Sequence, residues 1–166
     1  TGIAISQPAA ALNANVVSSS NISCFGGTNG TINLNVNGGT VPYIYTWSNG
    51  STSQNLVNVP AGTYAVTITD ANGCSFSITG QTLAQPAVAL SSSVSSSSDV
   101  TCFGGNNGSI NLNVNGGTVP YQFSWSNGAT TQNLINVSSG NYSVLITDAQ
   151  GCTSTVSSIL VVQPGA

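Results

Sequence analysis

Two long stretches of this sequence are nearly the same, and the period that separates them limits what the chain can fold into. Residues 24–50 return at residues 102–128 with 22 of 27 positions identical, so the period is 102 − 24 = 78. Cys74 and Cys152 keep the same offset, and Gln-Pro pairs recur at Gln7, Gln85 and Gln163. A fixed period comes before other patterns because it sets the architecture, and this one exceeds the roughly 20–50 residues of stacked solenoid repeats. Since each unit is long enough to bury its own core, we expect tandem domains.

The Gln-Pro pairs mark the expected domain boundaries, because proline cannot donate to a β-ladder and restricts the residue before it. We expect a first repeat at residues 7–84 and a second at residues 85–162. Residues 1–6 align with the last segment of each repeat, so they are predicted to be the final strand of a preceding repeat. Residues 163–166 are predicted to begin the next one.

Short apolar alternations separated by turn residues predict β-strands throughout each repeat. Asn-Gly occurs seven times and is a strong hairpin signal, because type I′ turns need positive φ at both central residues. No helical period appears. About seven short strands per repeat predict an all-β chain of tandem immunoglobulin-like antiparallel β-sandwiches.

Two features of the strands follow from comparing the repeats. Tyr45 becomes Phe123 while Ile44 becomes Gln122, so the face carrying Tyr43, Tyr45 and Trp47 is predicted to point inward. The run SSSVSSSS at residues 91–98 is either a flexible linker or a serine-rich edge strand. We favour the strand, since its counterpart at residues 12–20 is less biased in composition.

The composition excludes several functions. The chain has no Lys, Arg, His, Met or Glu, a net charge of −3, and 2% charged residues, against about 25% in ordinary domains. A hydrophobic content of 40% still indicates a folded core. Without Lys or Arg, the chain cannot hold phosphate electrostatically, which argues against binding nucleic acid or anionic membranes. Without His, Lys or Glu, the common catalytic constellations cannot be built, so we expect no enzyme and no cofactor. No apolar run approaches the ~18 residues of a membrane helix, so no membrane insertion is expected.

An ordered set of motifs carries a family resemblance. Both repeats contain Cys-Phe-Gly-Gly-x-Asn-Gly, Gly-Gly-Thr-Val-Pro-Tyr, Trp-Ser-Asn-Gly, Gly-x-Tyr-x-Val and Thr-Asp-Ala-x-Gly-Cys. This set resembles the SprB repeat, which occurs in giant surface adhesins of gliding Bacteroidota and in related secreted proteins. The resemblance covers both repeats almost end to end. It implies an extracellular, cell-surface adhesive stalk exported by the type IX route, and it identifies no ligand.

Each repeat has two cysteines at the same spacing, and no CxxC motif or histidine accompanies them. Zinc or iron–sulfur ligation is therefore not expected. An even cysteine count in a chain of surface-protein character predicts one disulfide per repeat, Cys24–Cys74 and Cys102–Cys152. The alternative is four reduced, buried thiols.

Two further pairs of residues are candidate sites. Asp70 and Asp148, in Asp-Ala-x-Gly turns, are either weak calcium ligands or caps of their own turns, and we favour the caps. Trp47 and Trp125 are either a platform for a glycan or core residues, and we favour the core.

The favoured function is a structural and adhesive surface module, a stalk or filament of tandem β-sandwiches. We expect it to self-associate laterally or end to end, because no lysine guards its strand edges and the net charge is small. Residues 1–6 would add to a neighbouring sheet, and two asparagine stripes would contact a neighbouring chain: Asn33, Asn35 and Asn37, with Asn111, Asn113 and Asn115. The alternative is a carbohydrate-binding module of a larger secreted protein, with surface polysaccharide as its partner.

Overall fold

The computed structural model describes residues 10–166, so the strand expected at residues 1–6 lies outside the described residues. The chain divides into two compact units, the first extending to Ile22 and resuming over Gly26–Gln85, the second made of Ser23–Phe25 and Pro86–Ala166. The division along the chain therefore falls between Gln85 and Pro86, whereas the sequence placed it one residue earlier. Three residues of the first repeat, Ser23–Phe25, group with the second unit.

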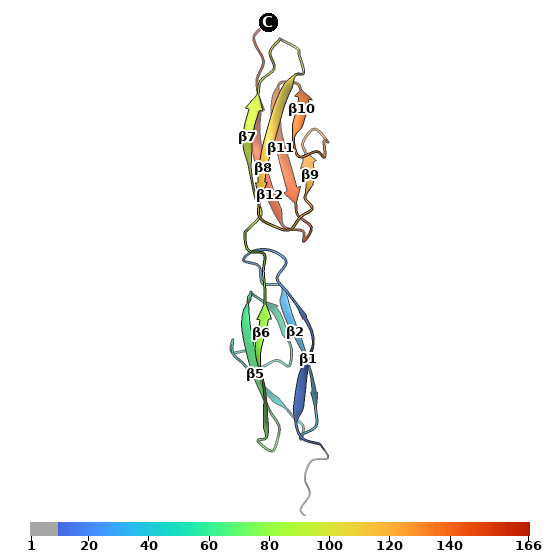
Figure 1. Ribbon diagram of the computed structural model, residues 1–166, viewed down its shortest axis with the longest axis vertical. Coiled ribbons are helices and arrows are strands. Elements are labelled where there is room, and N and C mark those ends of the chain that lie inside the picture. Colours follow the sequence, from blue (N-terminus) through green and yellow to red (C-terminus); the bar gives the residue numbers. More distant parts are fainter. Residues whose placement is uncertain (1–9) are drawn as a thin grey trace, which may run out of the picture. The chain divides into compact units, whose positions relative to one another are not determined.

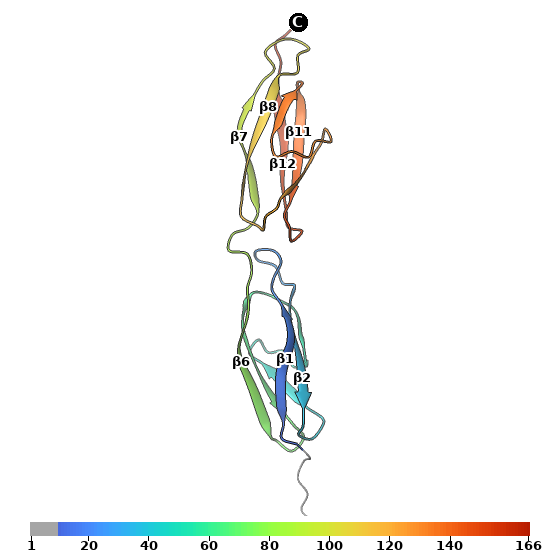
Figure 2. The same ribbon diagram turned by 45° about the vertical axis from the view of Figure 1, so that its right-hand side comes forward.

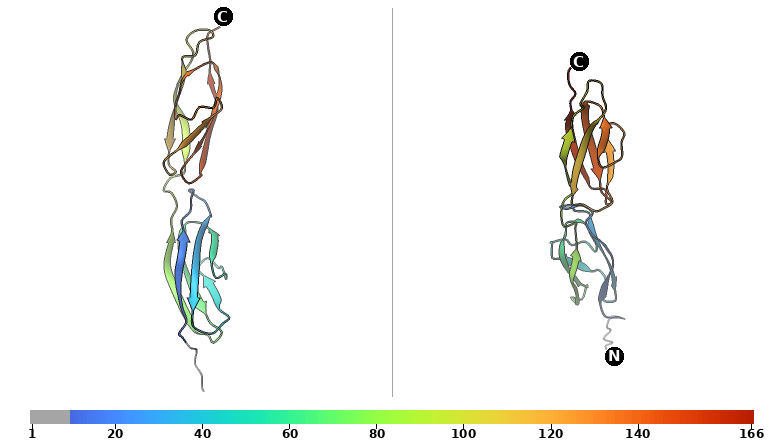
Figure 3. Two further views of the ribbon diagram at one scale, coloured as in Figure 1. Left: turned by 90° about the vertical axis from the view of Figure 1, so that its right-hand side faces the viewer. Right: turned by 45° about the horizontal axis from the view of Figure 1, so that its top comes forward.

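The first unit is built from two three-stranded antiparallel sheets (Figure 1). One has the order β1-β2-β4, with β1 Asn13–Ser20, β2 Gly30–Asn37 and β4 Leu56–Val59. The other has the order β3-β5-β6, with β3 Ile44–Trp47, β5 Gly62–Thr69 and β6 Ser75–Leu83. The sheets adjoin where β6 lies beside β1 (Figure 3, left).

The second unit repeats this arrangement strand for strand. Its sheets have the orders β10-β8-β7 and β12-β11-β9 and lie as two layers in Figure 2. The strands are β7 Ser91–Ser98, β8 Gly108–Asn115, β9 Gln122–Trp125, β10 Leu134–Val137, β11 Gly140–Thr147 and β12 Thr153–Val161. The run at residues 91–98 is thus an edge strand and not a linker.

The strand pairing is that of an immunoglobulin-like sandwich, which confirms the predicted fold class. The orders β1-β2-β4 and β3-β5-β6 correspond to strands A-B-E and C-F-G of that fold. The described part of each unit has six strands, where the sequence suggested about seven, because no strand D forms between β3 and β4.

Side-chain amides take over backbone pairing where β4 stops. The Asn55 Oδ1 accepts a hydrogen bond from the Leu34 N–H (2.9 Å), and the Gln54 Nε2 donates to the Leu34 carbonyl (3.0 Å). Asn133 and Gln132 do the same for Leu112 in the second unit. The central strands β2 and β8 are thereby satisfied beyond the ends of their short partners.

Two aromatic residues fix each sandwich in the manner of immunoglobulin domains. Trp47 in β3 is 3% exposed, and its indole N–H donates to the Ser53 carbonyl at 2.8 Å. Tyr64 in β5 donates its hydroxyl to the Pro60 carbonyl at 2.7 Å, the arrangement known as a tyrosine corner. The second unit repeats both contacts.

The core of the first unit lies between its two sheets, as period-2 alternation requires. Ile32 and Ile68 are fully buried within it, and Tyr43 and Tyr45 pack against it. Ile44, between the two tyrosines, is 62% exposed. This confirms the inward face predicted from the differences between repeats.

The Asn-Gly pairs do not form type I′ turns. Gly50 and Gly73 have positive φ, but the asparagines before them do not. Each glycine N–H donates to the carbonyl three residues earlier, from Gly50 to Trp47 and from Gly73 to Asp70. These are the positions that a type I turn gives to Gly at its fourth residue and Asp at its first. Residues 10–166 hold no helix with the length and apolar character needed to cross a bilayer.

Replacing Asn55 with Ala should destabilise the first unit by about 1–2 kcal/mol, because the part-buried Leu34 N–H loses its acceptor. Asn35→Ala, on the exposed outer face of β2, is the matched control and should change the free energy of unfolding by less than about 0.5 kcal/mol. Urea denaturation followed by tryptophan fluorescence would measure both. Equal effects of the two substitutions would contradict this account of the missing strand.

Candidate functional site

The four cysteines are not paired within the repeats. Cys24 of the first repeat is bonded to Cys152 of the second, with their Cα atoms 5.7 Å apart and a sequence separation of 128. Cys74 and Cys102 are free and exposed. The predicted pairs Cys24–Cys74 and Cys102–Cys152 are therefore wrong, and so is the alternative of four buried thiols.

The reason is that the two cysteines of a repeat lie at opposite ends of its last strand. In the second unit, Cys152 directly precedes β12, whereas Cys102 follows Val100, whose N–H donates to the Val162 carbonyl just beyond the end of β12. A strand of nine residues spans roughly 30 Å. Disulfide formation requires Cα atoms within roughly 4.4–6.8 Å, so the strand prevents the pairing within a repeat.

The loop that carries the first cysteine of each repeat is tied down by its own side chains. In the second repeat, the Thr101 N–H donates to the Asn107 Oδ1 (3.1 Å), and the Asn107 Nδ2 donates to the Thr101 hydroxyl (2.9 Å). The Gly105 N–H closes a turn onto the Cys102 carbonyl at 3.0 Å. Cys102 is thus presented on a folded loop.

The glutamine of each Gln-Pro pair holds this loop against the end of its repeat. The Gln85 Oε1 accepts from the Gly26 N–H (2.8 Å), and the Gln163 Oε1 accepts from the Gly104 N–H (3.0 Å). Sequence reasoning used these pairs only as boundaries and missed the role of the glutamine. The signal was available, because Gln-Pro recurs with the same period as the Cys-Phe-Gly-Gly motif.

The turn that carries the second cysteine is organised by an aspartate. In the second unit, the Asp148 carboxylate accepts from the backbone N–H groups of Thr118, Gln150 and Cys152, each at 2.8 Å. The Asp148 N–H in turn donates to the Cys152 carbonyl at 2.9 Å. One carboxylate therefore joins the β11–β12 turn to the segment between β8 and β9, and fixes the backbone of Cys152.

Asp70 has the same role in the first unit, with Thr40, Asn72 and Cys74 as donors at 2.9 Å. Burial in itself raises the pKa of Asp70, but the backbone hydrogen bonds outweigh it and leave the pKa below its usual value. The pKa of Asp148 is lowered by the same balance. Both carboxylates are held ionised by backbone N–H groups, so they cap their turns, and the calcium alternative does not fit this donor set.

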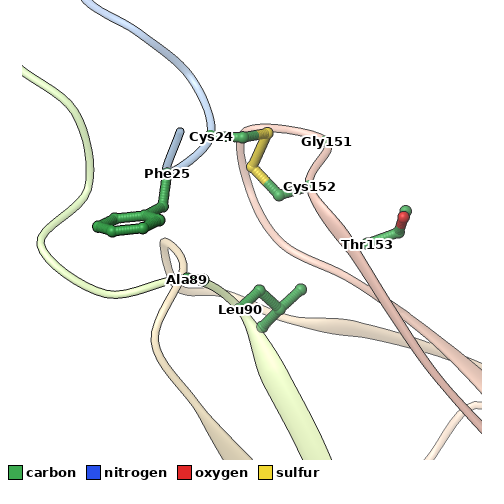
Figure 4. Close-up of a pocket in the computed structure, with 7 residues that line it drawn as sticks. All are labelled: Cys24, Phe25, Ala89, Leu90, Gly151, Cys152 and Thr153. Atoms are coloured by element: carbon green, nitrogen blue, oxygen red, sulfur yellow. A yellow bond between two sulfur atoms is a disulfide. The ribbon is translucent and has the colours of Figure 1, made fainter. Parts of the chain in front are cut away.

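A shallow recess adjoins the disulfide within the second unit (Figure 4). Its lining includes Cys24 and Phe25 together with Ala89, Leu90 and the start of β12. The Phe25 ring lies on the Ala89 and Leu90 side of the disulfide and remains 50% exposed. The covalent bond is therefore accompanied by limited apolar contact.

The structure separates the asparagine stripes from this site. They lie on the outer faces of β2 and β8, which are central strands of their sheets and not edges. Asn33 donates to the Ser18 hydroxyl (2.9 Å) and Asn111 to the Ser96 hydroxyl (3.0 Å), while the remaining asparagines of the stripes are exposed. The stripes are therefore polar outer surfaces of the sandwiches.

The tryptophans lie in the cores. Trp125, like Trp47, is 3% exposed, which leaves no indole face on which a sugar could stack. The interpretation of the tryptophans as glycan contacts therefore does not fit. Across residues 10–166, no three His, Cys, Asp or Glu side chains gather as a metal site would require.

Comparison with known proteins gives one family match. The SprB repeat family matches residues 16–52 and 94–130. No curated protein matches the sequence.

Two solved structures are similar in outline. The three N-terminal domains of the highly immunogenic outer capsid protein of bacteriophage RB49 align with a TM-score of 0.44 and 16% identity, over 92% of this chain. A C-terminal fragment of intimin, solved in complex with the intimin-binding domain of the translocated intimin receptor, aligns with a TM-score of 0.47 and 12% identity, also over 92%. The chain spans 58% and 64% of these two structures.

The stability of the chain should be level between about pH 5 and 7 and fall as the pH drops below about 4. The lowered pKa values of Asp70 and Asp148 mean that their ionised forms stabilise the fold. That contribution is complete above the unfolded-state pKa of about 4 and is lost as the pH falls through the folded-state value. Thermal melts across this range would measure the effect.

The double variant Asp70→Asn/Asp148→Asn should be less stable at pH 7 and lose most of this acid sensitivity. Asp99→Asn is the control and should keep the acid transition, because the first repeat already has Asn21 at the equivalent position with the same contact to the backbone. An acid transition that survives in the double variant would contradict the assigned role.

Proposed function

The chain carries two SprB repeats, and we propose that it is a structural and adhesive module of the cell surface that forms a stalk or an extracellular filament. SprB repeats occur in surface adhesins, and a disulfide suggests a location outside the reducing cytoplasm. The observation that carries the proposal is the Cys24–Cys152 bond, because it links successive repeats covalently.

Such a bond suits a protein that bears tension. When the chain is pulled from its two ends, force that reaches Cys24 passes directly to Cys152 through the disulfide. Residues 25–151, which contain strands β2 to β11, lie inside the closed loop and carry no load. Disulfides within each repeat would instead leave the chain between the repeats under load. The observed pairing therefore supports a stalk function better than the predicted one would.

The polar outer faces offer a surface for contact between copies. In the first unit, Asn35 and Asn37 of β2 lie opposite Asn15 and Asn13 of β1, so amide groups cover adjacent strands of the sheet. No cationic side chain and only three carboxylates oppose the approach of a second copy. These features support lateral self-association through amide hydrogen bonds, and the outer face suits that contact better than the short edge strands β3 and β4.

Single-molecule pulling on the ends of the chain tests the load-bearing part of the proposal. The oxidised protein should unfold without releasing residues 25–151, and added reductant should then release roughly 420–460 Å of further chain, at 3.3–3.6 Å per residue over the 128-residue loop. Disulfides within the repeats would close two shorter loops and release only roughly 330–360 Å. The shorter release, or none, would remove the basis of the proposal.

Sedimentation velocity over a wide concentration range tests self-association. We expect the weight-average sedimentation coefficient to rise with concentration, and the rise to be lost in Asn35→Asp/Asn113→Asp, which puts like charges on the outer faces. Asn49→Asp/Asn127→Asp adds the same charge at exposed turns, where Oδ1 remains an acceptor for the turn N–H, so this control should still associate. A strict monomer at every concentration would contradict the filament proposal.

A further inference from the structure

We propose that Cys74 and Cys102 are the two unpaired halves of the same disulfide, and that they join copies of this chain covalently. Cys102 of one copy would bond to Cys74 of the next. The inference rests on the proposed function, since it supplies the bond by which the surface module would be extended. It concerns a second copy of this chain as the partner.

The repeat equivalence defines the pairing. Cys102 occupies in the second repeat the position that Cys24 has in the first, and Cys74 is likewise the counterpart of Cys152. The observed bond joins the first cysteine of one repeat to the second cysteine of the repeat that follows. Cys102 is the first cysteine of the second repeat, and the second cysteine offered by the first repeat of another copy is Cys74. The rule that explains the bonded pair thus assigns a partner to each free thiol.

The two free thiols are accessible, whereas their bonded counterparts are partly covered. Cys74 and Cys102 are exposed, while Cys24 and Cys152 are of intermediate burial. Phe103, which follows Cys102, is 61% exposed, compared with 50% for Phe25 beside the bonded Cys24. The difference has the direction expected if Cys102 and Phe103 form a donor segment that has not yet been docked.

The first unit also has the residues that receive such a segment. In the second unit, the recess that accepts Cys24 and Phe25 is lined by Ala89, Leu90, Gly151, Cys152 and Thr153. The equivalent residues of the first unit are Ala11, Leu12, Gly73, Cys74 and Ser75. Four of these five are identical, and the fifth exchanges one small hydroxyl side chain for another. A second copy would therefore meet the same surface chemistry around Cys74.

Both cysteine-bearing segments are already folded in the form that makes the bond. Asp70 holds the Cys74 N–H at 2.9 Å, as Asp148 holds that of Cys152 at 2.8 Å. Gln163 holds the Cys102 loop as Gln85 holds the Cys24 loop. Little ordering of either segment is needed on association, which favours this pairing over random contact between thiols.

The bond forms by oxidation, and a disulfide-carrying oxidant of the extracytoplasmic space would accept the electrons. The Cys102 thiolate attacks the oxidant disulfide, gives a mixed disulfide and releases one thiol. The Cys74 thiolate of the second copy then attacks the Cys102 sulfur and releases the other thiol. Two S–H bonds are replaced by one S–S bond, two protons are lost from the cysteines, and the oxidant takes up two electrons.

Two variants mixed together provide the test. Cys74→Ser keeps only the Cys102 thiol and Cys102→Ser keeps only the Cys74 thiol, and both changes are at exposed positions. One variant is labelled with ¹⁵N, the two are mixed in equal amounts with glutathione disulfide, and the covalent dimers are weighed by intact mass spectrometry. Circular dichroism and thermal melts of each variant confirm that both are folded, and intact masses confirm that Cys24–Cys152 is retained.

We expect the mixed dimer to exceed the share given by random pairing by several-fold, and dithiothreitol to abolish it. Wild-type chain under the same conditions should give a ladder of covalent oligomers on a non-reducing gel. A random distribution of dimers in the mixture would overturn the inference, as would a wild-type chain that stays monomeric while its Cys24–Cys152 bond is complete.

Failure of this inference can be told apart from failure of the proposed function. The double variant Cys74→Ser/Cys102→Ser cannot form the bond, yet it should still show the concentration-dependent sedimentation expected of the module. If it associates while the mixed dimer is not favoured, the covalent inference fails and the proposed function stands. If it does not associate and the mixed dimer is not favoured either, both fail.

Discussion

The two cysteines of each repeat lie at opposite ends of a nine-residue strand, and this separation decides how the chain is cross-linked. Antiparallel pairing sends the last strand back along the sandwich, so the turn before it and the loop beside its end cannot meet. The first cysteine of one repeat is instead bonded to the second cysteine of the next. A cross-link that would have stabilised one domain becomes a connection between consecutive repeats, and the proposed load-bearing role depends on this change.

Backbone N–H groups and side-chain amides do in this chain what ion pairs do in ordinary proteins. With no Lys, Arg or His in the sequence, the carboxylates of Asp70 and Asp148 have no cationic side-chain partner and are held by backbone donors. Gln85 and Gln163 hold the cysteine loops, and Asn55 completes the ladder beside β2. These contacts involve neutral donors or acceptors, so salt should affect them less than it affects exposed ion pairs. That property suits a protein exposed to a variable external medium.

The parts of the fold that could be predicted from the sequence are those encoded locally. Alternation along β2 and the exchange of Ile44 for Gln122 placed the inward faces, and the strand at residues 91–98 followed from its counterpart in the first repeat. Type I′ turns were expected at Asn-Gly, but the turns that begin at Trp47 and Asp70 use only the glycine in its special conformation. The disulfide could not be read from spacing, because the distance in sequence between two cysteines does not say at which end of a sandwich each one lies. Strand direction could have told, since Cys24 precedes the second strand and Cys74 the last, and these strands begin at opposite ends.

Peptide mapping without reduction tests the central claim most directly. Trypsin has no site in this chain, but an endoproteinase that cleaves before Asp would cut at Asp70, Asp99 and Asp148 and leave one cysteine in each of four fragments. Free thiols are blocked first and the digestion is carried out in denaturant. The account predicts that residues 148–166 are linked to residues 1–69. A link between residues 1–69 and 70–98 would contradict it.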